Sequence, residues 1–172
     1  RRWTYAVSKL AAEHLAHSYH AEYDLPVITV RPFNVYGPRQ VGEGAIREMI
    51  RLALADEPVI LYGGGTQIRS WCYVDDFVDG ILLCLGTESA KGQVFNLGNP
   101  LGTSANINLV ETIIRLTNSK SEILHKPHPG PEVEIRVPSI GRAHDMLGFD
   151  PKVGLEEGIG RTIAWYRENL PQ

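Results

Sequence analysis

The first stretch of the chain repeats apolar and small residues at helical spacing, from residue 4 to about residue 23. The positions that carry this period are Val7, Leu10, Ala11, His14, Leu15 and Ser18. The spacing predicts a helix, which Leu25 and Pro26 end. The β-branched run VITVR at residues 27–31 is typical of a strand buried in a parallel sheet.

The rest of the chain alternates predicted helices with predicted strands. The predicted helices are residues 45–55, a segment from Asp75 or Asp76 as N-cap to about residue 85, residues 106–117, a segment from Ser139 as N-cap to Gly148 as stop, and residues 155–169. The predicted strands are residues 59–62, 93–98 and 121–125, with residues 68–74 extended. This alternation indicates an α/β fold.

The glycines of the chain do not form a dinucleotide-binding turn. Such a turn has the pattern G-x-G-x-x-G between a strand and a helix, whose N-terminus faces the pyrophosphate. The run at residues 63–65 lacks a third glycine at the right spacing and opens no predicted helix, and Gly42 with Gly44 also fails. We therefore expect no phosphate cradle for a dinucleotide in this chain.

Size and composition are those of a single globular domain. The chain has 172 residues, 43% of them hydrophobic and 22% charged. Its net charge of −3, with no basic tail, argues against nucleic acid or an anionic membrane as the partner. Two cysteines, Cys72 and Cys84, are too few for a disulfide framework and are expected to be reduced, buried residues of a cytoplasmic protein.

The opening stretch RRWTYAVSKL places Tyr5 and Lys9 four residues apart, on one face of the predicted helix. A tyrosine with the usual pKa near 10 is a poor base at neutral pH, but a nearby ammonium favours the phenolate. Such a pair can take a proton from a sugar hydroxyl while a hydride leaves the carbon. Two ordinary exposed helix residues would explain the same spacing.

Five stretches in order decide between these alternatives. They are YAVSK, RPFNVYGPRQ, GGGTQIRSWCYVDD, FNLGNP and IRVPSIGRAHDMLGFDPKVGLEEGI. Together they resemble the extended short-chain dehydrogenase/reductase family, the NAD-dependent nucleotide-sugar epimerases, dehydratases and decarboxylases. The family's glycine-rich turn, and the Ser/Thr of its Ser–Tyr–Lys set, would lie before Arg1. The resemblance therefore implies the C-terminal part of such an enzyme.

The resemblance implies a role for each matching residue. Tyr5 would be the catalytic base, and Lys9 would tune it and bind the nicotinamide ribose of NAD. Pro32 and Phe33 would lie beside the nicotinamide. The residues implied for the substrate are Asn34 for the phosphates, Gln67 and Arg69 beside the diphosphate, Arg136 as a second diphosphate arginine, and Tyr62 and Asn96 near the base. Apart from the resemblance, Asn34 could be a turn residue and Arg69 a surface strand residue.

Three other groups have simpler explanations than chemistry. His14, His17 and His20 follow one another at intervals of three, but no carboxylate or cysteine completes a metal-binding set, so we expect no metal. An N-cap explains Asp75 and Asp76 better than a catalytic pair does. Residues 63–65 form a turn between strands.

The resemblance also implies the reaction. Tyr5 would deprotonate a sugar hydroxyl, usually at C4, to give a 4-keto sugar bound to its nucleotide. The stretches RRWTYAVSK, GGGTQIRSW and RVPSIGRAH look most similar to UDP-glucuronate decarboxylases, in which the arginine matching Arg69 also lies near the sugar carboxylate. A 4-epimerase or a 4,6-dehydratase stays open. A non-catalytic module that binds a nucleotide sugar is the alternative of another class, and a dehydrogenase of simple alcohols is disfavoured.

The implied architecture is the C-terminal part of a Rossmann-type parallel sheet with a small α/β substrate-binding lobe. Residues 1–32 and 68–98 would belong to the dinucleotide-binding fold, and residues 33–62 and 121–172 to the lobe. The surface that meets the rest of the fold should be apolar, because residues 27–31 predict a strand buried on both faces. We expect a UDP-sugar as the substrate and a homodimer formed through the first helix.

Overall fold

The computed structural model of the protein describes residues 2–127, 130 and 133–169. The helices are α1 (Arg2–Tyr23), α2 (Ala45–Leu54), α3 (Val74–Gly86), α4 (Asn106–Thr117), α5 (Gly141–Leu147) and α6 (Leu155–Asn169). The strands are β1 (Thr29–Pro32), β2 (Val35–Tyr36), β3 (Val59–Tyr62), β4 (Ile68–Ser70), β5 (Cys72–Tyr73), β6 (Val94–Leu97), β7 (Thr103–Ala105), β8 (Ile123–Lys126) and β9 (Ile135–Arg136). The short 3-10 turns are η1 (Glu88–Ala90) and η2 (Pro100–Gly102).

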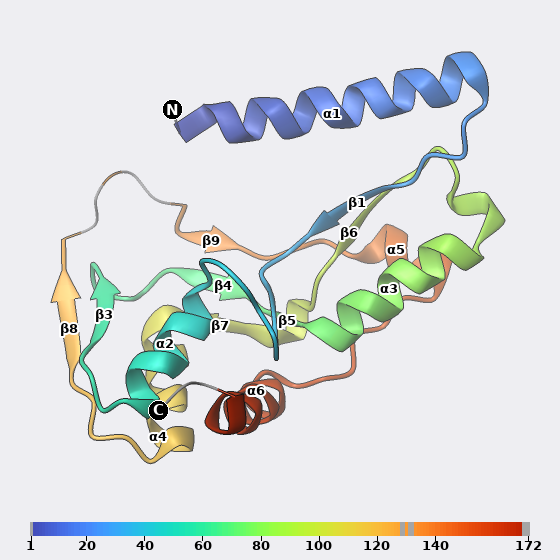
Figure 1. Cartoon of the computed structure of the whole chain (residues 1–172). Helices are drawn as coiled ribbons and strands as arrows, with labels where there is room; N and C mark the ends of the chain where they lie inside the picture. Colours follow the sequence, from blue (N-terminus) through green and yellow to red (C-terminus); the bar gives the residue numbers. More distant parts are fainter. Residues whose placement is uncertain (1, 128–129, 131–132, 170–172) are drawn as a thin grey trace.

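One group of elements is built on the parallel pair of β1 and β6. Val30 lies opposite Phe95 and Pro32 opposite Leu97, and α1 and α3 lie on opposite sides of this pair (Figure 1). Phe95 and Leu97 are fully buried and form a core with residues of α3 and α5. Strand β6 alternates half-buried and buried residues, as expected for a sheet with one packed face.

A second group contains α2, α4 and α6 with the remaining strands (Figure 1). Strand β3 pairs in parallel with β8, and β4 lies between β7 and β9 in a three-stranded sheet. Ile46, Ile50 and Ala53 recur on one face of α2 and are buried. The core of this group contains Tyr36, Ile46, Ile50, Ala53, Trp71, Tyr73, Leu109, Ile113, Ile159, Ile163 and Tyr166.

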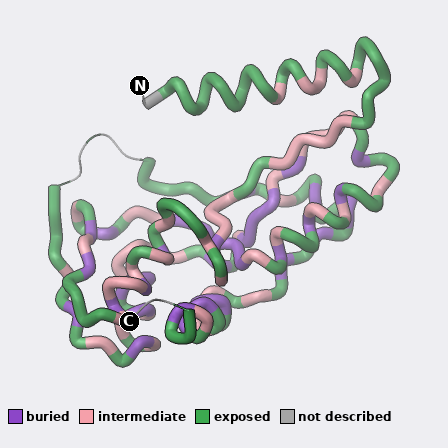
Figure 2. The backbone as a smooth tube through the Cα atoms, viewed as in Figure 1, coloured by how far each residue is buried: buried purple, intermediate pink, exposed green. Residues whose placement is uncertain are grey.

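Helix α1 lies apart from both cores (Figure 1), and most of its length is exposed (Figure 2). Its apolar side chains are largely open to solvent, with Trp3 74% exposed and Leu10 66% exposed. Among the residues that the structure describes, Glu13 joins it to Arg31 of β1 and His17 joins it to Thr29. Packing therefore does not hold α1 as it holds the other helices.

The α/β fold class and the order of the predicted elements are confirmed, but both predicted N-caps are wrong. Helix α3 follows β5 directly, so its N-cap is Tyr73, and the Asp76 carboxylate instead accepts hydrogen bonds from later backbone amides. Helix α5 begins after Ile140, so Ser139 lies outside it. Gly148 does end that helix, with a φ of 68°. The extended segment 68–74 divides into β4, β5 and the first residue of α3.

Cys72 and Cys84 are buried free thiols, as expected. The helices of the described residues include none that is both long and apolar enough to cross a membrane.

Candidate active site

Tyr5 and Lys9 lie one turn apart on α1, on the face expected from their spacing. The Lys9 ammonium lies 5.6 Å from the centroid of the Tyr5 ring. Both side chains line a cavity of about 520 Å³ between α1 and β1, together with Arg31 and Pro32. A phenol and an ammonium therefore stand at the edge of an open space at the end of β1.

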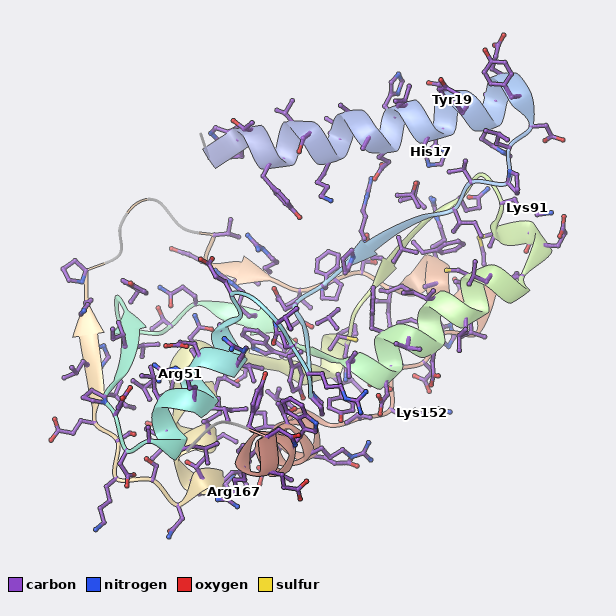
Figure 3. All side chains as sticks on the ribbon, in the orientation of Figure 1. His17, Tyr19, Arg51, Lys91, Lys152 and Arg167 are labelled. Carbon is purple, nitrogen blue, oxygen red and sulfur yellow. The ribbon has the colours of Figure 1, made fainter. Side chains whose placement is uncertain are left out.

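Polar contacts fix where α1 lies relative to β1. The Arg31 guanidinium donates to both carboxylate oxygens of Glu13, with Nε 2.9 Å from Oε2. This hydrogen bonding lowers the pKa of Glu13. Further along the helix, Nε2 of His17 is 3.2 Å from the Thr29 hydroxyl, and Figure 3 shows His17 on the side of α1 that faces β1. These contacts hold Tyr5 and Lys9 above the strand.

Pro32 ends β1 and Phe33 follows it, donating its backbone N–H to the carbonyl of Leu97 in β6. A side chain at Gly98 would place its Cβ 2.8 Å from the Cβ of Phe33 and 2.9 Å from a carbon of Pro138. Glycine is therefore required at this position for the backbone to approach so closely. The geometry keeps Pro32 beside the cavity that Tyr5 and Lys9 line.

The residues around this cavity fit the nicotinamide end of a dinucleotide. Lys9 can donate hydrogen bonds to ribose hydroxyls, and Tyr5 can donate to or accept from them. Pro32 supplies an apolar surface beside these polar groups. The sequence has no G-x-G-x-x-G turn for the pyrophosphate.

Arg69 and Arg136 lie directly opposite each other on the parallel strands β4 and β9. Arg69 is only 8% exposed, and its Nη1 donates to the backbone carbonyls of Ile68 at 2.8 Å and Glu134 at 3.2 Å. Residues opposite each other point to the same face of a sheet, and like charges there repel. An anion between the two guanidinium groups removes that repulsion, and arginine binds phosphate oxygens bidentately.

Asn34 contacts the end of β4, the strand that carries Arg69. Its backbone is left-handed, with a φ of 41°, which asparagine tolerates better than most residues. Its side-chain Nδ2 donates to the Ser70 carbonyl at 2.7 Å. The structure therefore places Asn34 against the residue that follows Arg69 in β4.

Tyr62 and Gln67 line a second cavity, of about 320 Å³, where β3 meets the first turns of α2 and α4. Its walls are largely apolar, with Met49 among them. The Gln67 Oε1 atom is buried and accepts no hydrogen bond from any residue that the structure describes. A flat ring with polar edges fits such a space.

Asn106, the first residue of α4, lines the same cavity. Sequence reasoning missed it because its position at a helix start already has a structural explanation. Only the fold brings it beside Gln67, whose carbonyl accepts the Asn106 backbone N–H at 3.0 Å.

Asn96 does not lie with Tyr62 and Gln67. It is on β6, which pairs with β1 in the other group of elements, and its Nδ2 donates to the Ser139 carbonyl at 3.0 Å. Its role in the base-binding region stays a prediction, and in the structure the side chain ties β6 to the segment before α5.

Across the described ranges of the chain, no three His, Cys, Asp or Glu side chains gather as metal ligands would. The ring of His17 contacts Thr29, and Nδ1 of His20 is 2.6 Å from the Leu25 carbonyl. His17 therefore attaches α1 to β1, and His20 attaches α1 to the turn that follows it.

Known proteins are similar to this chain in sequence. The chain is 36% identical over 176 residues to UDP-N-acetyl-alpha-D-glucosaminuronate decarboxylase of Bacillus cytotoxicus, covering 97% of this chain and 54% of the relative. It is also 36% identical over 176 residues to dTDP-D-glucose 4,6-dehydratase of Mus musculus, covering 96% and 48%. The chain thus spans about half the length of the curated relatives it matches.

A solved structure agrees. UDP-glucuronic acid 4-epimerase from Bacillus cereus, in complex with UDP-glucuronic acid and NAD, matches with a TM-score of 0.89 and 28% identity, over 95% of this chain and 52% of that one. The model of the NAD dependent epimerase/dehydratase family matches residues 1–98. The expected cofactor, NAD, is confirmed at the level of the family. This chain belongs to the NAD dependent epimerase/dehydratase family.

Proposed function

We propose that this chain carries the substrate-binding part, and the Tyr–Lys pair, of an NAD-dependent enzyme that acts on a nucleotide sugar through a 4-keto intermediate. The observation that carries the proposal is the register of Arg69 against Arg136 on β4 and β9. Two guanidinium groups on one face of a sheet favour a ligand with several negative charges, and a diphosphate is such a ligand. The cavity at Tyr62 and Gln67 supports a base beside it.

Within this proposal, decarboxylation of UDP-glucuronate or a related sugar acid comes first. The likeness to a decarboxylase of Bacillus cytotoxicus supports it. Tyr5 would take the proton of the C4 hydroxyl, and Lys9 and Pro32 would hold the nicotinamide end of NAD, which would supply the acceptor for the hydride of the same carbon. Oxidation at C4 gives a β-keto acid, which loses CO2 readily. Arg69 binds the diphosphate and orients the sugar carboxylate.

Two other reactions share the first step and differ after it. A 4-epimerase returns the hydride to the other face of the sugar, and a 4,6-dehydratase eliminates water. The relatives of those names support both as alternatives. The division into a dinucleotide-binding part (1–32, 68–98) and a substrate lobe (33–62, 121–172) is kept in this proposal. The free, buried Cys72 and Cys84 support a reducing compartment such as the cytoplasm.

A binding module without turnover is the candidate of another class. The absence of a G-x-G-x-x-G turn from the sequence favours it for the 172 residues taken alone. We therefore expect these residues to bind UDP and to show no NAD-dependent conversion of UDP-glucuronate. Release of CO2 by the isolated chain with added NAD would contradict this expectation.

Calorimetric titration with UDP, and separately with NAD, tests the proposal. We expect UDP to bind, and Arg69→Ala to weaken it by about tenfold or more, because a charge-assisted contact with phosphate is lost. Arg115→Ala is the matched control, since Arg115 is an exposed helix residue that pairs with Glu156. No heat with UDP, or equal affinity in both variants, would contradict the diphosphate site.

A further inference from the structure

A buried asparagine joins the two groups of elements close to the proposed diphosphate site. Asn99 follows β6 and Gly98 and is 3% exposed. Its Oδ1 accepts the backbone N–H groups of Leu101 at 2.9 Å and Gly102 at 3.1 Å, which caps η2. Its Nδ2 donates to the carbonyl of Val153 at 3.1 Å. The side chain therefore links β6 to the segment that leads into α6.

The backbone of Asn99 also contacts β4. Its carbonyl accepts a hydrogen bond from the hydroxyl of Ser70, which is fully buried. Ser70 follows Arg69 directly, and its own carbonyl accepts the Nδ2 of Asn34 at 2.7 Å. Two of the residues expected at the phosphates are thus attached to Ser70, Arg69 through the chain and Asn34 through a hydrogen bond.

The segment before α6, which Asn99 contacts through Val153, is itself tied to α3. The carboxylate of Asp76, 5% exposed, accepts the backbone N–H groups of Lys152 at 2.9 Å and Val153 at 3.1 Å. Figure 3 shows Lys152 near the first turn of α3. The backbone N–H of Trp71, which follows Ser70, donates to the carbonyl of Gly102 at 3.0 Å. A Cβ at Gly102 would collide with the Trp71 carbonyl. The strand carrying Arg69 has little freedom to shift against β6.

We propose that Ser70 and Asn99 are positioning residues, which fix Arg69 and Asn34 at a set place relative to the β1–β6 sheet. That sheet carries Pro32 and lies under Tyr5 and Lys9. A ligand whose diphosphate is held by Arg69 is then held at a fixed place relative to the β1–β6 sheet that lies under the Tyr–Lys pair. As far as it names the ligand, this inference rests on the proposed function.

The test compares UDP with uridine monophosphate, which has the same nucleoside but no second phosphate. We expect Ser70→Ala to weaken UDP binding about tenfold, because the Asn99 carbonyl is left without its buried donor and β4 can shift. Binding of the monophosphate should change less than about twofold. Asn99→Asp, which keeps the Oδ1 acceptor and loses the donor to Val153, should act in the same direction.

Ser121→Ala is the matched control. It also removes a buried serine hydroxyl, but in the turn between α4 and β8, where that hydroxyl accepts from Ser119. UDP and monophosphate weakened by the same factor would indicate general damage to the fold and would overturn the inference.

A second readout does not depend on any ligand. In protein labelled with ¹⁵N-arginine, the Nε–H signal of Arg69 should shift or broaden in Ser70→Ala and Asn99→Asp and stay unchanged in Ser121→Ala. An unchanged Arg69 signal in the first two variants would overturn the positioning role. Failure of the unaltered protein to bind UDP would instead count against the proposed function, and the Arg69 signal would still decide the role of Ser70 and Asn99.

Discussion

At the scale of the residue, several weak acids are buried where their charged forms are disfavoured. Burial raises the pKa of Cys72 to about 12. Burial also raises the pKa of Tyr36, whose hydroxyl donates to the Leu155 carbonyl at 3.1 Å, and that of Cys84. The folded state therefore holds protons that the unfolded chain releases in alkaline solution.

This predicts that the protein loses stability as the pH rises above about 8.5, the ordinary pKa of a cysteine thiol. A folded pKa above the unfolded one contributes stability that is complete below the unfolded pKa and is lost as the pH approaches the folded value. For Cys72 that window runs from about 8.5 to about 12. Within this window, ionisation of Cys72 in the unfolded chain lowers the free energy of unfolding by about 1.4 kcal/mol per pH unit. Urea unfolding between pH 7 and pH 10.5 measures it.

Cys72→Ala is the variant that isolates this thiol. Its unfolding free energy should be lower than that of the unaltered protein at pH 7, but should fall less steeply above pH 8.5. Parallel curves for the two proteins would contradict the assignment of the slope to Cys72.

At the scale of the element, α1 depends on a polar contact rather than on a packed face. Glu13→Gln should lower the free energy that attaches α1 to β1 by about 0.5 kcal/mol. The loss is small because the pair with Arg31 is partly exposed. The pKa of Glu13 is lowered, so this attachment is complete above about pH 4.3 and is lost as the pH falls through the folded value. Hydrogen exchange of the amides of residues 13–20 measures it. Glu22→Gln, an exposed glutamate of the same helix, is the control and should change little.

The elements themselves were largely predictable because each has a local signal. The period of α1, the β-branched run before Arg31 and the glycine at 148 all act within a few residues. The strands β2, β7 and β9 have two or three residues each, too few to show a period. Their existence depends on partners far along the chain, and no local pattern encodes those partners.

In the candidate site, too, contacts between residues close in sequence could be predicted, and contacts between distant residues could not. Tyr5 and Lys9 share a helix face, so their contact could be predicted from spacing alone. Arg69 and Arg136 are opposite each other only because β9 pairs with β4. The network at Asn99 uses side chains bonded to backbone groups, which leaves no period in the sequence. For Asn96, a resemblance between sequences does not say which sheet edge its side chain faces, and in the structure that side chain donates to the Ser139 carbonyl.

At the scale of the whole molecule, α1 is exposed along most of its length (Figure 2). Trp3, Val7 and Leu10 share one face of the helix at spacings of four and three residues, and each is at least 62% exposed. Exposed apolar side chains gathered on one face mark a site of interaction with another protein surface. We propose, as expected from the sequence, that a second copy of the chain covers it in a homodimer.

Sedimentation velocity over a range of protein concentrations tests this dimer. We expect a dimer that Leu10→Glu converts to monomer, because a buried carboxylate without a partner costs several kcal/mol. Val41→Glu is the matched control: Val41 is 89% exposed in the segment before α2, so the same charge there should leave the dimer intact. A monomer at every concentration would contradict the proposal. Dissociation by both substitutions alike would show that net charge, and not the α1 surface, governs assembly. A dimer that survives Leu10→Glu would place the interface elsewhere and leave the two copies of the Tyr–Lys helix independent of each other.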